Sequence, residues 1–127
     1  MSSGDFPVWL DFIRLYGSTF KGFYYDVAVG TPSEVPEGTS PELGRMWERI
    51  TRRRLDAVGV MDEEWWLIEV RANARPSVAG EILVYLDSWK EDPPPEAPKV
   101  RGVVVARIID PDTVKLLDKH GIMLITI

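Results

Sequence analysis

Two acidic residues, Asp56 and Glu69, occupy neighbouring segments whose residue pattern is typical of β-strands. A short acidic turn joins the segments Arg54–Met61 and Trp65–Ala72, so the pattern predicts a hairpin. If the turn is centred between positions 62 and 63, residues whose numbers add up to 125 lie opposite one another. Asp56 then faces Glu69, with their Cβ atoms about 4.5–5.5 Å apart. A turn of three residues would break this register unless a bulge restored it.

Two carboxylates that face each other in an otherwise apolar hairpin repel, and this repulsion can be relieved in three ways. A divalent cation can bridge them, one carboxyl group can hold a proton, or a cationic side chain can neutralise them. Hard oxygen ligands favour Mg²⁺ or Mn²⁺, and such a metal activates water in phosphodiester hydrolysis. Arg71 follows Glu69 by two residues on the same strand face and could supply the positive charge without a metal. The residues alone leave these alternatives open.

The rest of the sequence predicts the elements that must position this hairpin. Helices are expected over Pro7–Tyr16, from Ser40-Pro41 to Arg52, over Ser77–Trp89 and from Asp110-Pro111 to His120-Gly121. Further strands are expected over Phe23–Val29, Gly102–Ile109 and Ile122–Ile127. Stretches rich in Gly or Pro predict loops over Gly30–Ser40 and Glu91–Pro98. A hairpin followed by alternating helices and strands indicates an α/β (α+β) fold, a mixed β-sheet flanked by helices.

Apolar spacing also predicts the buried sides of the first helix and the first strand. The apolar side of the helix comprises Trp9, Leu10, Ile13 and Tyr16. Strict alternation places four strand residues on one face, namely Phe23, Tyr25, Val27 and Val29.

The stretch from Pro41 to Tyr85 resembles the PD-(D/E)XK nuclease superfamily. The resemblance lies in Arg-Leu-Asp56-Ala-Val-Gly, in Leu-Ile-Glu69-Val-Arg71 and in a helix with Gly80-Glu81-Ile-Leu-Val-Tyr85. That superfamily places an Asp on one strand and Glu-x-Lys on the next, and some branches carry Gln-x-x-x-Tyr on the following helix. The resemblance implies a restriction-endonuclease-like core and, with the later strands, covers roughly the last 90 residues.

Carried over to these positions, the resemblance implies that Asp56 and Glu69 are metal ligands and that the carbonyl of Val70 completes the site. An active site of this kind would use Mg²⁺ or Mn²⁺, with Asp56, Glu69 and Arg71 as its catalytic residues, whereas an inactive one would need no cofactor. Arg71 stands where the superfamily has lysine. Arginine stays protonated and cannot act as a base, although it can stabilise charge on a phosphate. Glu42 or Glu48, on the preceding helix, would be the additional acid.

Arginines on the helix before the hairpin form a stripe of Arg45, Arg49 and Arg52, which we expect to contact phosphate or an acidic partner. The alternative is a solvated face paired with neighbouring acids. The resemblance adds Glu81 and Tyr85 as contact positions. A carboxylate at position 81, where the superfamily has glutamine, would repel a DNA phosphate.

Length and composition limit the class of protein. The 127 residues fit a single domain, with residues 1–40 as an extension and 41–127 as the core. A net charge of −5 disfavours a protein that coats nucleic acid by charge alone, and the lack of cysteine excludes disulfides and thiolate sites. The single asparagine, the lack of glutamine and the 10 prolines indicate a thermophile tendency. No segment reads as a signal peptide or a membrane span, so we expect a cytoplasmic or virion protein.

Two functions are therefore expected from the sequence. The first is a catalytically weakened nuclease-fold protein that serves as a structural or adaptor part of a larger assembly. Because the sequence also resembles small tailed-phage gene products, that assembly could be a head–tail (neck) complex, with copies of the chain or other protein subunits as partners. The second is an active Mg²⁺-dependent DNA endonuclease or exonuclease, a deoxyribonuclease whose partner is DNA.

Overall fold

The structure is a computed structural model that describes the chain except for residues 31–33, 52, 92 and 95–98 and the side chains of residues 47–51. The described helices are α1 (Phe6–Tyr16), the short 3₁₀ helix η1 (Gly17–Thr19), α2 (Pro41–Thr51), α3 (Ser77–Glu91) and α4 (Pro111–Lys119). The described strands are β1 (Gly22–Val29), β2 (Arg53–Val60), β3 (Trp65–Ala74), β4 (Val100–Ile109) and β5 (Met123–Thr126). All helices and strands expected from the sequence are present with ends shifted by at most two residues, and η1 was not foreseen.

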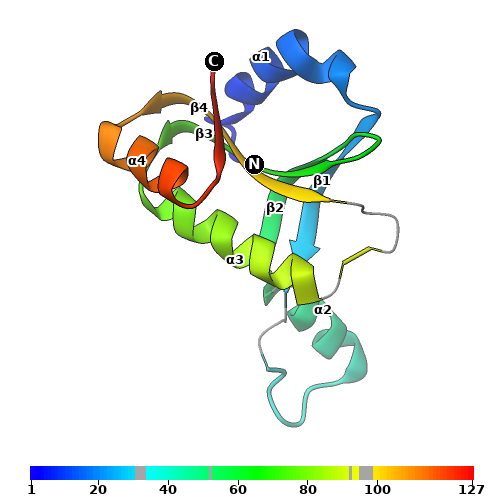
Figure 1. Cartoon of the computed structure of the whole chain (residues 1–127). Helices are drawn as coiled ribbons and strands as arrows, with labels where there is room; N and C mark the ends of the chain where they lie inside the picture. The colour runs from blue at the N-terminus through cyan, green and yellow to red at the C-terminus, as the bar shows by residue number, and fades with distance from the viewer. Residues whose placement is uncertain (31–33, 52, 92, 95–98) are drawn as a thin grey trace.

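The strands form one mixed sheet in the order β1-β2-β3-β4-β5. β1, β2 and β3 run antiparallel, whereas β3, β4 and β5 run parallel. Parallel neighbours need a crossover, and α3 and α4 supply it between β3 and β4 and between β4 and β5. Helix α1 covers one face of the sheet, and α3 and α4 cover the other (Figure 1). The prediction of a mixed sheet flanked by helices is confirmed.

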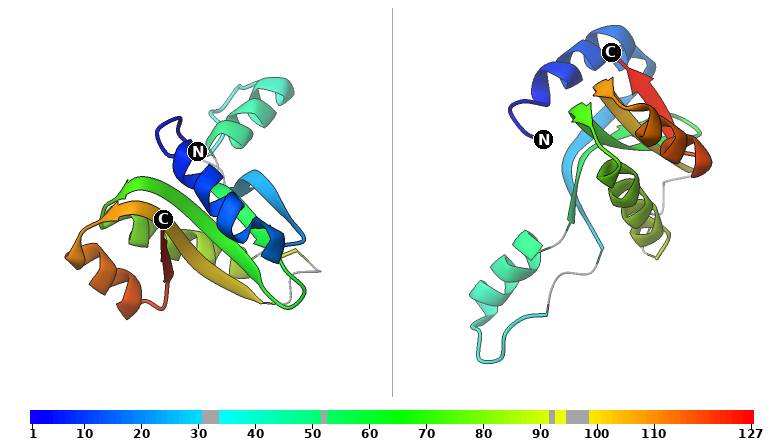
Figure 2. Two further views of the ribbon diagram at one scale, coloured as in Figure 1. Left: turned by 90° about the horizontal axis from the view of Figure 1, so that it is seen from above. Right: turned by 90° about the vertical axis from the view of Figure 1, so that its left-hand side faces the viewer.

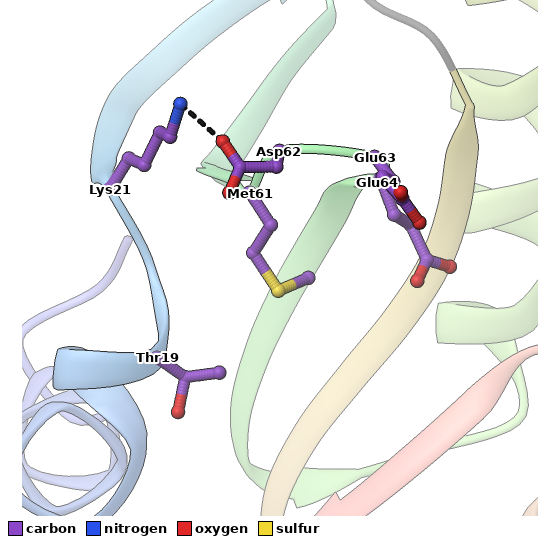
Figure 3. A pocket seen from close by; sticks show the side chains of 6 residues that line it. All are labelled: Thr19, Lys21, Met61, Asp62, Glu63 and Glu64. Atoms are coloured by element: carbon purple, nitrogen blue, oxygen red, sulfur yellow. Dashed lines mark ion pairs between the residues drawn. The ribbon is translucent and has the colours of Figure 1, made fainter.

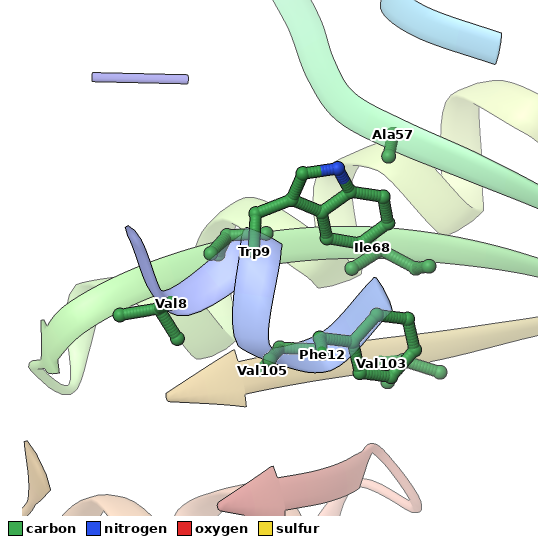
Figure 4. Close-up of a cluster of buried hydrophobic side chains, with 8 residues drawn as sticks. Val8, Trp9, Phe12, Ala57, Ile68, Val103 and Val105 are labelled. Carbon is green, nitrogen blue, oxygen red and sulfur yellow. The ribbon is translucent and has the colours of Figure 1, made fainter. Parts of the chain in front are cut away.

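Helix α1 is held to its face of the sheet by Val8, Trp9 and Phe12, each at most 2% exposed. Figure 4 shows these side chains turned toward Ile68, Val103 and Val105 of the central strands. The predicted apolar side of this helix was partly wrong, because Leu10 and Tyr16 are 39% and 42% exposed. The stripe that faces the sheet follows positions 8, 9 and 12, and Leu10 lies off this stripe. Tyr16 continues the spacing of four residues from Phe12 and contacts its ring, but it is the last residue of the helix and stays partly exposed.

Local sequence explains the start of α4 and the close packing of α3 on the opposite face. The carboxylate of Asp110 accepts a hydrogen bond from the Thr113 amide at 2.7 Å, and Pro111 occupies the first turn, as the sequence predicts. A Cβ atom at Gly102 of β4 would lie 2.5 Å from Ile82, so glycine there lets α3 approach the sheet. Among the described residues, no helix is long and apolar enough to cross a membrane.

The β2–β3 hairpin has the register expected from the sequence. Its paired residues are Ala57↔Ile68, Val58↔Leu67, Gly59↔Trp66 and Val60↔Trp65, and each pair adds up to 125. The turn is closed by a hydrogen bond from the Met61 amide to the Glu64 carbonyl at 3.1 Å. Two residues therefore lie between these positions, which is the turn length that the prediction required.

Strand β1 departs from regular alternation at Asp26, which has a φ of +53°. This left-handed conformation is uncommon for a residue other than glycine. Tyr25 and Val27 pair with Ala57 and Leu55 on either side, but Asp26 has no ladder partner. Phe23 and Tyr25 contact Trp9 of α1, whereas Val27 and Val29 pack with the α3-side cluster of Leu55 and Trp89. The prediction that these four β1 residues share one face was therefore wrong, because the strand turns at Asp26.

Helix α2 lies away from the sheet, at the far end of β1 and β2 (Figures 1 and 2). Ser40 accepts a hydrogen bond from the Leu43 amide at 3.3 Å, and Pro41 is the first helical residue, as predicted. Leu43 and Met46 are 57% and 49% exposed. The helix that precedes the hairpin in sequence is thus not packed beside the acidic pair.

Candidate functional site

The two predicted acids meet at the end of the hairpin farthest from its turn. The Asp56 amide donates to Oε1 of Glu69 at 3.2 Å, and the Val70 amide donates to Oδ2 of Asp56 at 2.9 Å. Regular backbone pairing of β2 with β3 extends only as far as Ala57↔Ile68. Beyond this pair, the two carboxylates accept the amide hydrogen bonds that carbonyl groups accept in a regular ladder. The acids therefore hold the strands together in addition to carrying charge.

Arg71 lies between the acids, and its guanidinium contacts four oxygen atoms. Nη1 is 3.1 Å from Oδ2 of Asp56 and 2.8 Å from the carbonyl oxygen of Val70. Nη2 is 2.8 Å from Oε2 of Glu69 and 2.6 Å from Oε2 of Glu81. The planar guanidinium presents five donors, which is enough for all four contacts. Arg71 thereby joins β2, β3 and α3 through one side chain.

The two central acids are largely buried, since the side chains of Asp56 and Glu69 are 10% and 3% exposed. Burial and the nearby Asp56 carboxylate raise the pKa of Glu69 to about 7, although Arg71 attracts the ionised form. Burial acts to lower the pKa of Arg71, but the carboxylates of Glu69, Glu81 and Asp56 outweigh it and raise that pKa. The amino group of Met1 adds a second positive charge, 3.1 Å from Oδ1 of Asp56.

Tyr85 of α3 closes the site on the helix side. Its hydroxyl group donates to the carbonyl of Arg54 at 3.1 Å, and its side chain is buried. Burial, with the negative charges of Glu69, Glu81 and Asp56, raises the pKa of Tyr85 to about 12. Tyr85 therefore stays neutral at physiological pH and links α3 to the start of β2.

The other predicted site residues lie on or near α2. Glu42 and Arg45 are exposed on this helix, apart from the carboxylate cluster. The side chains of Glu48 and Arg49 and the whole of Arg52 lie outside the described residues. The structure thus brings together Asp56, Glu69, Val70, Arg71, Glu81 and Tyr85, and Glu42 and Arg45 do not join them.

Two residues beside the site were not foreseen. Oδ1 of Asp5 accepts a hydrogen bond from the Ala72 amide at 2.7 Å, so the segment before α1 supports β3 next to Arg71. Asp26 lies between Tyr25 and Val27, the β1 residues that pair with Ala57 and Leu55 on either side of Asp56, and its carbonyl accepts a hydrogen bond from Arg54 at 3.2 Å. Aligning the β1 pattern with β2 could have placed Asp26 there. The contact of Asp5 joins residues 67 positions apart and leaves no local signal.

The donors of this site are of the type that Mg²⁺ or Mn²⁺ prefers, but their arrangement does not fit a metal ion. Each of the three predicted ligands, the two carboxylates and the Val70 carbonyl, already accepts a hydrogen bond or ion pair from Arg71. Within the described part of the chain, no three acidic or histidine residues are placed so that they could hold a metal ion. The arrangement fits a buried cluster of ion pairs instead.

A separate hollow lies at the opposite end of the hairpin, beside its turn (Figure 3). It is lined by Thr19, Lys21, Met61, Asp62, Glu63 and Glu64. Lys21 and Asp62 form an ion pair there, and their side chains are 65% and 77% exposed. The hollow holds no buried ionisable pair of the kind found at the Asp56 end.

Comparison with known proteins gives a likeness in structure only, since neither a family model nor a curated protein sequence matches the chain. The chain is similar to the crystal structure of a protein of unknown function, AF1548, with 15% identity and a TM-score of 0.59 over 96% of this chain and 57% of the other. It is also similar to EndoMS in a complex with double-stranded DNA, with 15% identity and a TM-score of 0.55 over 100% of this chain and 46% of the other.

These likenesses establish the fold. EndoMS has a nuclease fold, and the mixed five-stranded sheet flanked by helices is shared with it. A repair endonuclease from Pyrococcus abyssi matches with 18% identity and a TM-score of 0.49, over 100% of this chain and 47% of the other. The chain spans about half the length of the solved structures that it matches.

Proposed function

We propose that this chain is a nuclease-fold protein with weakened catalysis that serves as a structural or adaptor part of a larger assembly. One observation carries the proposal: the guanidinium of Arg71 binds both acids and the Val70 carbonyl, the groups that a cleaving site would need. Arginine cannot act as the base that activates water, because it stays protonated. Bonded to three carboxylates, Arg71 is also not free to stabilise an incoming phosphate.

The assembly proposed here consists of further copies of this chain or of other protein subunits, as in the head–tail (neck) complex of a tailed phage. Exposed apolar side chains on α2, Leu43 and Met46, support a protein partner. A net charge of −5 supports protein association over binding along a nucleic acid. Native mass spectrometry of the purified protein, alone and with candidate subunits, tests this part directly. A chain that stays monomeric at every concentration and binds no subunit would contradict it.

A second candidate function is DNA cleavage by an active nuclease. Asp56 and Glu69 lie beside one another on adjacent strands, as the resemblance to PD-(D/E)XK nucleases requires, and EndoMS was solved with double-stranded DNA. In this case Arg71 would leave the carboxylates and contact the phosphate, and a divalent cation would take part.

Plasmid cleavage with Mg²⁺ or Mn²⁺ separates the two candidates. We compare the wild type with Asp56→Asn, which keeps the side-chain shape but removes the charge. The proposal predicts no difference between the two proteins, whereas nicking that disappears in Asp56→Asn would favour the nuclease. Arg71→Lys restores the residue of the superfamily motif. A gain of cleavage in this variant would show that arginine is the change that weakened catalysis.

A further inference from the structure

The contacts of Arg71 carry an inference about how the site is built. Its two terminal nitrogens bind four oxygen atoms, from two β2 and β3 carboxylates, one β3 carbonyl and one α3 carboxylate, at 2.6–3.1 Å. Carboxylate and carbonyl oxygens are also the ligands that a hard divalent cation takes. The guanidinium therefore lies between these four oxygen atoms and contacts the same kinds of atom that a bound metal ion would contact.

We propose that Arg71 is a built-in replacement for the divalent cation of a nuclease site. Its positive charge compensates the charges of Asp56 and Glu69, and its two terminal nitrogens link β2, β3 and α3 as a bound metal ion would link them. The inference deepens the proposed function and rests on the same nuclease-fold resemblance. It goes further in two ways: the wild type takes up no divalent cation at this site, and removal of the guanidinium leaves room for the three carboxylates that it contacts to draw together around a cation.

Burial explains why some cation is needed. The side chains of Asp56 and Glu69 are 10% and 3% exposed, so water cannot compensate two negative charges there. Removing one partner from a buried ion pair leaves an uncompensated charge, which is strongly unfavourable. Without Arg71, the carboxylates of Asp56, Glu69 and Glu81 keep only one positive charge beside them in the part of the chain that the structure describes, the amino group of Met1. A divalent cation is the small ligand that restores this charge through the same oxygen atoms.

Glu81 has a specific part in this arrangement. Its Oε2 atom lies 2.6 Å from Nη2 of Arg71, and its side chain is 36% exposed. A carboxylate at this position balances an arginine better than a neutral glutamine would, since ion pairs with arginine are stronger than neutral hydrogen bonds. Arg71 and Glu81 are the two departures from the superfamily pattern, and the structure shows them in direct contact. We therefore treat them as one coupled change.

The test measures binding of Mn²⁺ alone, by calorimetry and by the shift of the thermal unfolding midpoint. The proteins are the wild type, Arg71→Met, Arg71→Lys and the double variant Arg71→Met with Asp56→Asn. Arg101→Met is the matched control, because Arg101 makes a comparable ion pair with Glu64 at 2.6 Å outside the site. All measurements use the full chain, and circular dichroism checks the fold of each variant.

We expect no Mn²⁺ response from the wild type or from Arg101→Met. Arg71→Met should bind Mn²⁺ at least about tenfold more tightly than the wild type, and its unfolding midpoint should rise with added Mn²⁺. The double variant should lose that response. If Arg71→Met folds only with Mn²⁺, the inference is supported in its strongest form. If that variant fails to fold at all, Mn²⁺ binding by Arg71→Lys tests the inference instead. One ammonium group cannot span four oxygens, so this variant should leave room for Mn²⁺ and bind it.

Two results would overturn the inference. One is Mn²⁺ binding by the wild type that Asp56→Asn abolishes, because the guanidinium would then not exclude the metal. The other is a folded Arg71→Met or Arg71→Lys protein with no response to Mn²⁺. These outcomes are distinct from failure of the proposed function. Cleavage of DNA by the wild type without Mn²⁺ binding would reject the proposed function alone, and Mn²⁺ binding without cleavage would reject only the inference.

Discussion

The two ends of the β2–β3 hairpin are built in different ways. Near the turn, four residue pairs from Ala57↔Ile68 to Val60↔Trp65 are joined backbone to backbone, and their inward side chains are apolar. At the far end, Asp56 and Glu69 join the strands through their side chains, and Arg71 neutralises them. The turn end depends on packing, whereas the far end depends on charge. The stability of the turn end should therefore respond to changes in side-chain volume, and the stability of the far end should respond to pH.

This difference affects how substitutions at the far end must be interpreted. A carboxylate that accepts a strand amide is part of the sheet, so its removal also leaves a buried donor without a partner. Loss of activity in an Asp56 variant therefore identifies a catalytic role only if circular dichroism shows that the variant keeps its fold, and Asp56→Asn is suited to this because it keeps an oxygen that can accept the Val70 amide. The following predictions separate packing from charge in the two halves.

Ile68→Ala should give the largest loss of stability. Ile68 is fully buried against α1 at the turn end, and truncation of a buried isoleucine costs about 2–5 kcal/mol in the free energy of unfolding. Urea unfolding at several pH values measures the loss, which should not vary with pH. A loss that changed strongly with pH would contradict the division of the hairpin into a packed half and a charged half.

The wild type should lose stability relative to Glu69→Gln as the pH rises from 4.5 toward 7. The pKa of Glu69 is raised from 4.5 to about 7 in the folded chain. Below 4.5 both states keep the proton, whereas between these values the unfolded chain releases it first, so unfolding becomes easier. One pKa unit corresponds to about 1.4 kcal/mol, and we expect a relative loss of about 3 kcal/mol between pH 4.5 and 8. Parallel stability curves for the two proteins would reject the raised pKa.

Tyr85→Phe should cost about 1 kcal/mol, the usual value of one hydrogen bond, because the bond from the Tyr85 hydroxyl group to the Arg54 carbonyl is lost while the packing of the ring remains. Thermal unfolding measures the cost. The matched control is Tyr24→Phe, since Tyr24 is 58% exposed and should tolerate the change. Equal effects of the two substitutions would show that the hydroxyl group of Tyr85 does not join α3 to β2.

Lys21→Ala should have the smallest effect, less than about 0.5 kcal/mol, because its ion pair with Asp62 is mostly exposed to water. Urea unfolding at low and high salt measures this pair. A large effect that disappears at high salt would show that charge also stabilises the turn end and would weaken the contrast between the two ends.

The sequence predicted those parts of the molecule that depend on local spacing. Alternation and turn length were sufficient to place Asp56 near Glu69, and the capping residues Ser40 and Asp110 marked where two helices begin. It offered Arg71 as one of three ways to neutralise the acids but could not choose among them, because the rotamer of a long side chain depends on surroundings from three elements. The interruption at Asp26 was also missed, since alternation carries no information on a change of φ at one residue.

That interruption has a consequence for association between molecules. β1 is an edge strand, and an edge with free amide and carbonyl groups can recruit a strand from another chain and lead to aggregation. The left-handed residue at position 26 breaks the regular row of these groups, and β5 at the opposite edge has only four residues. Neither border offers a long, straight template. Any partner is therefore expected to bind through side-chain surfaces and not by adding a strand to the sheet.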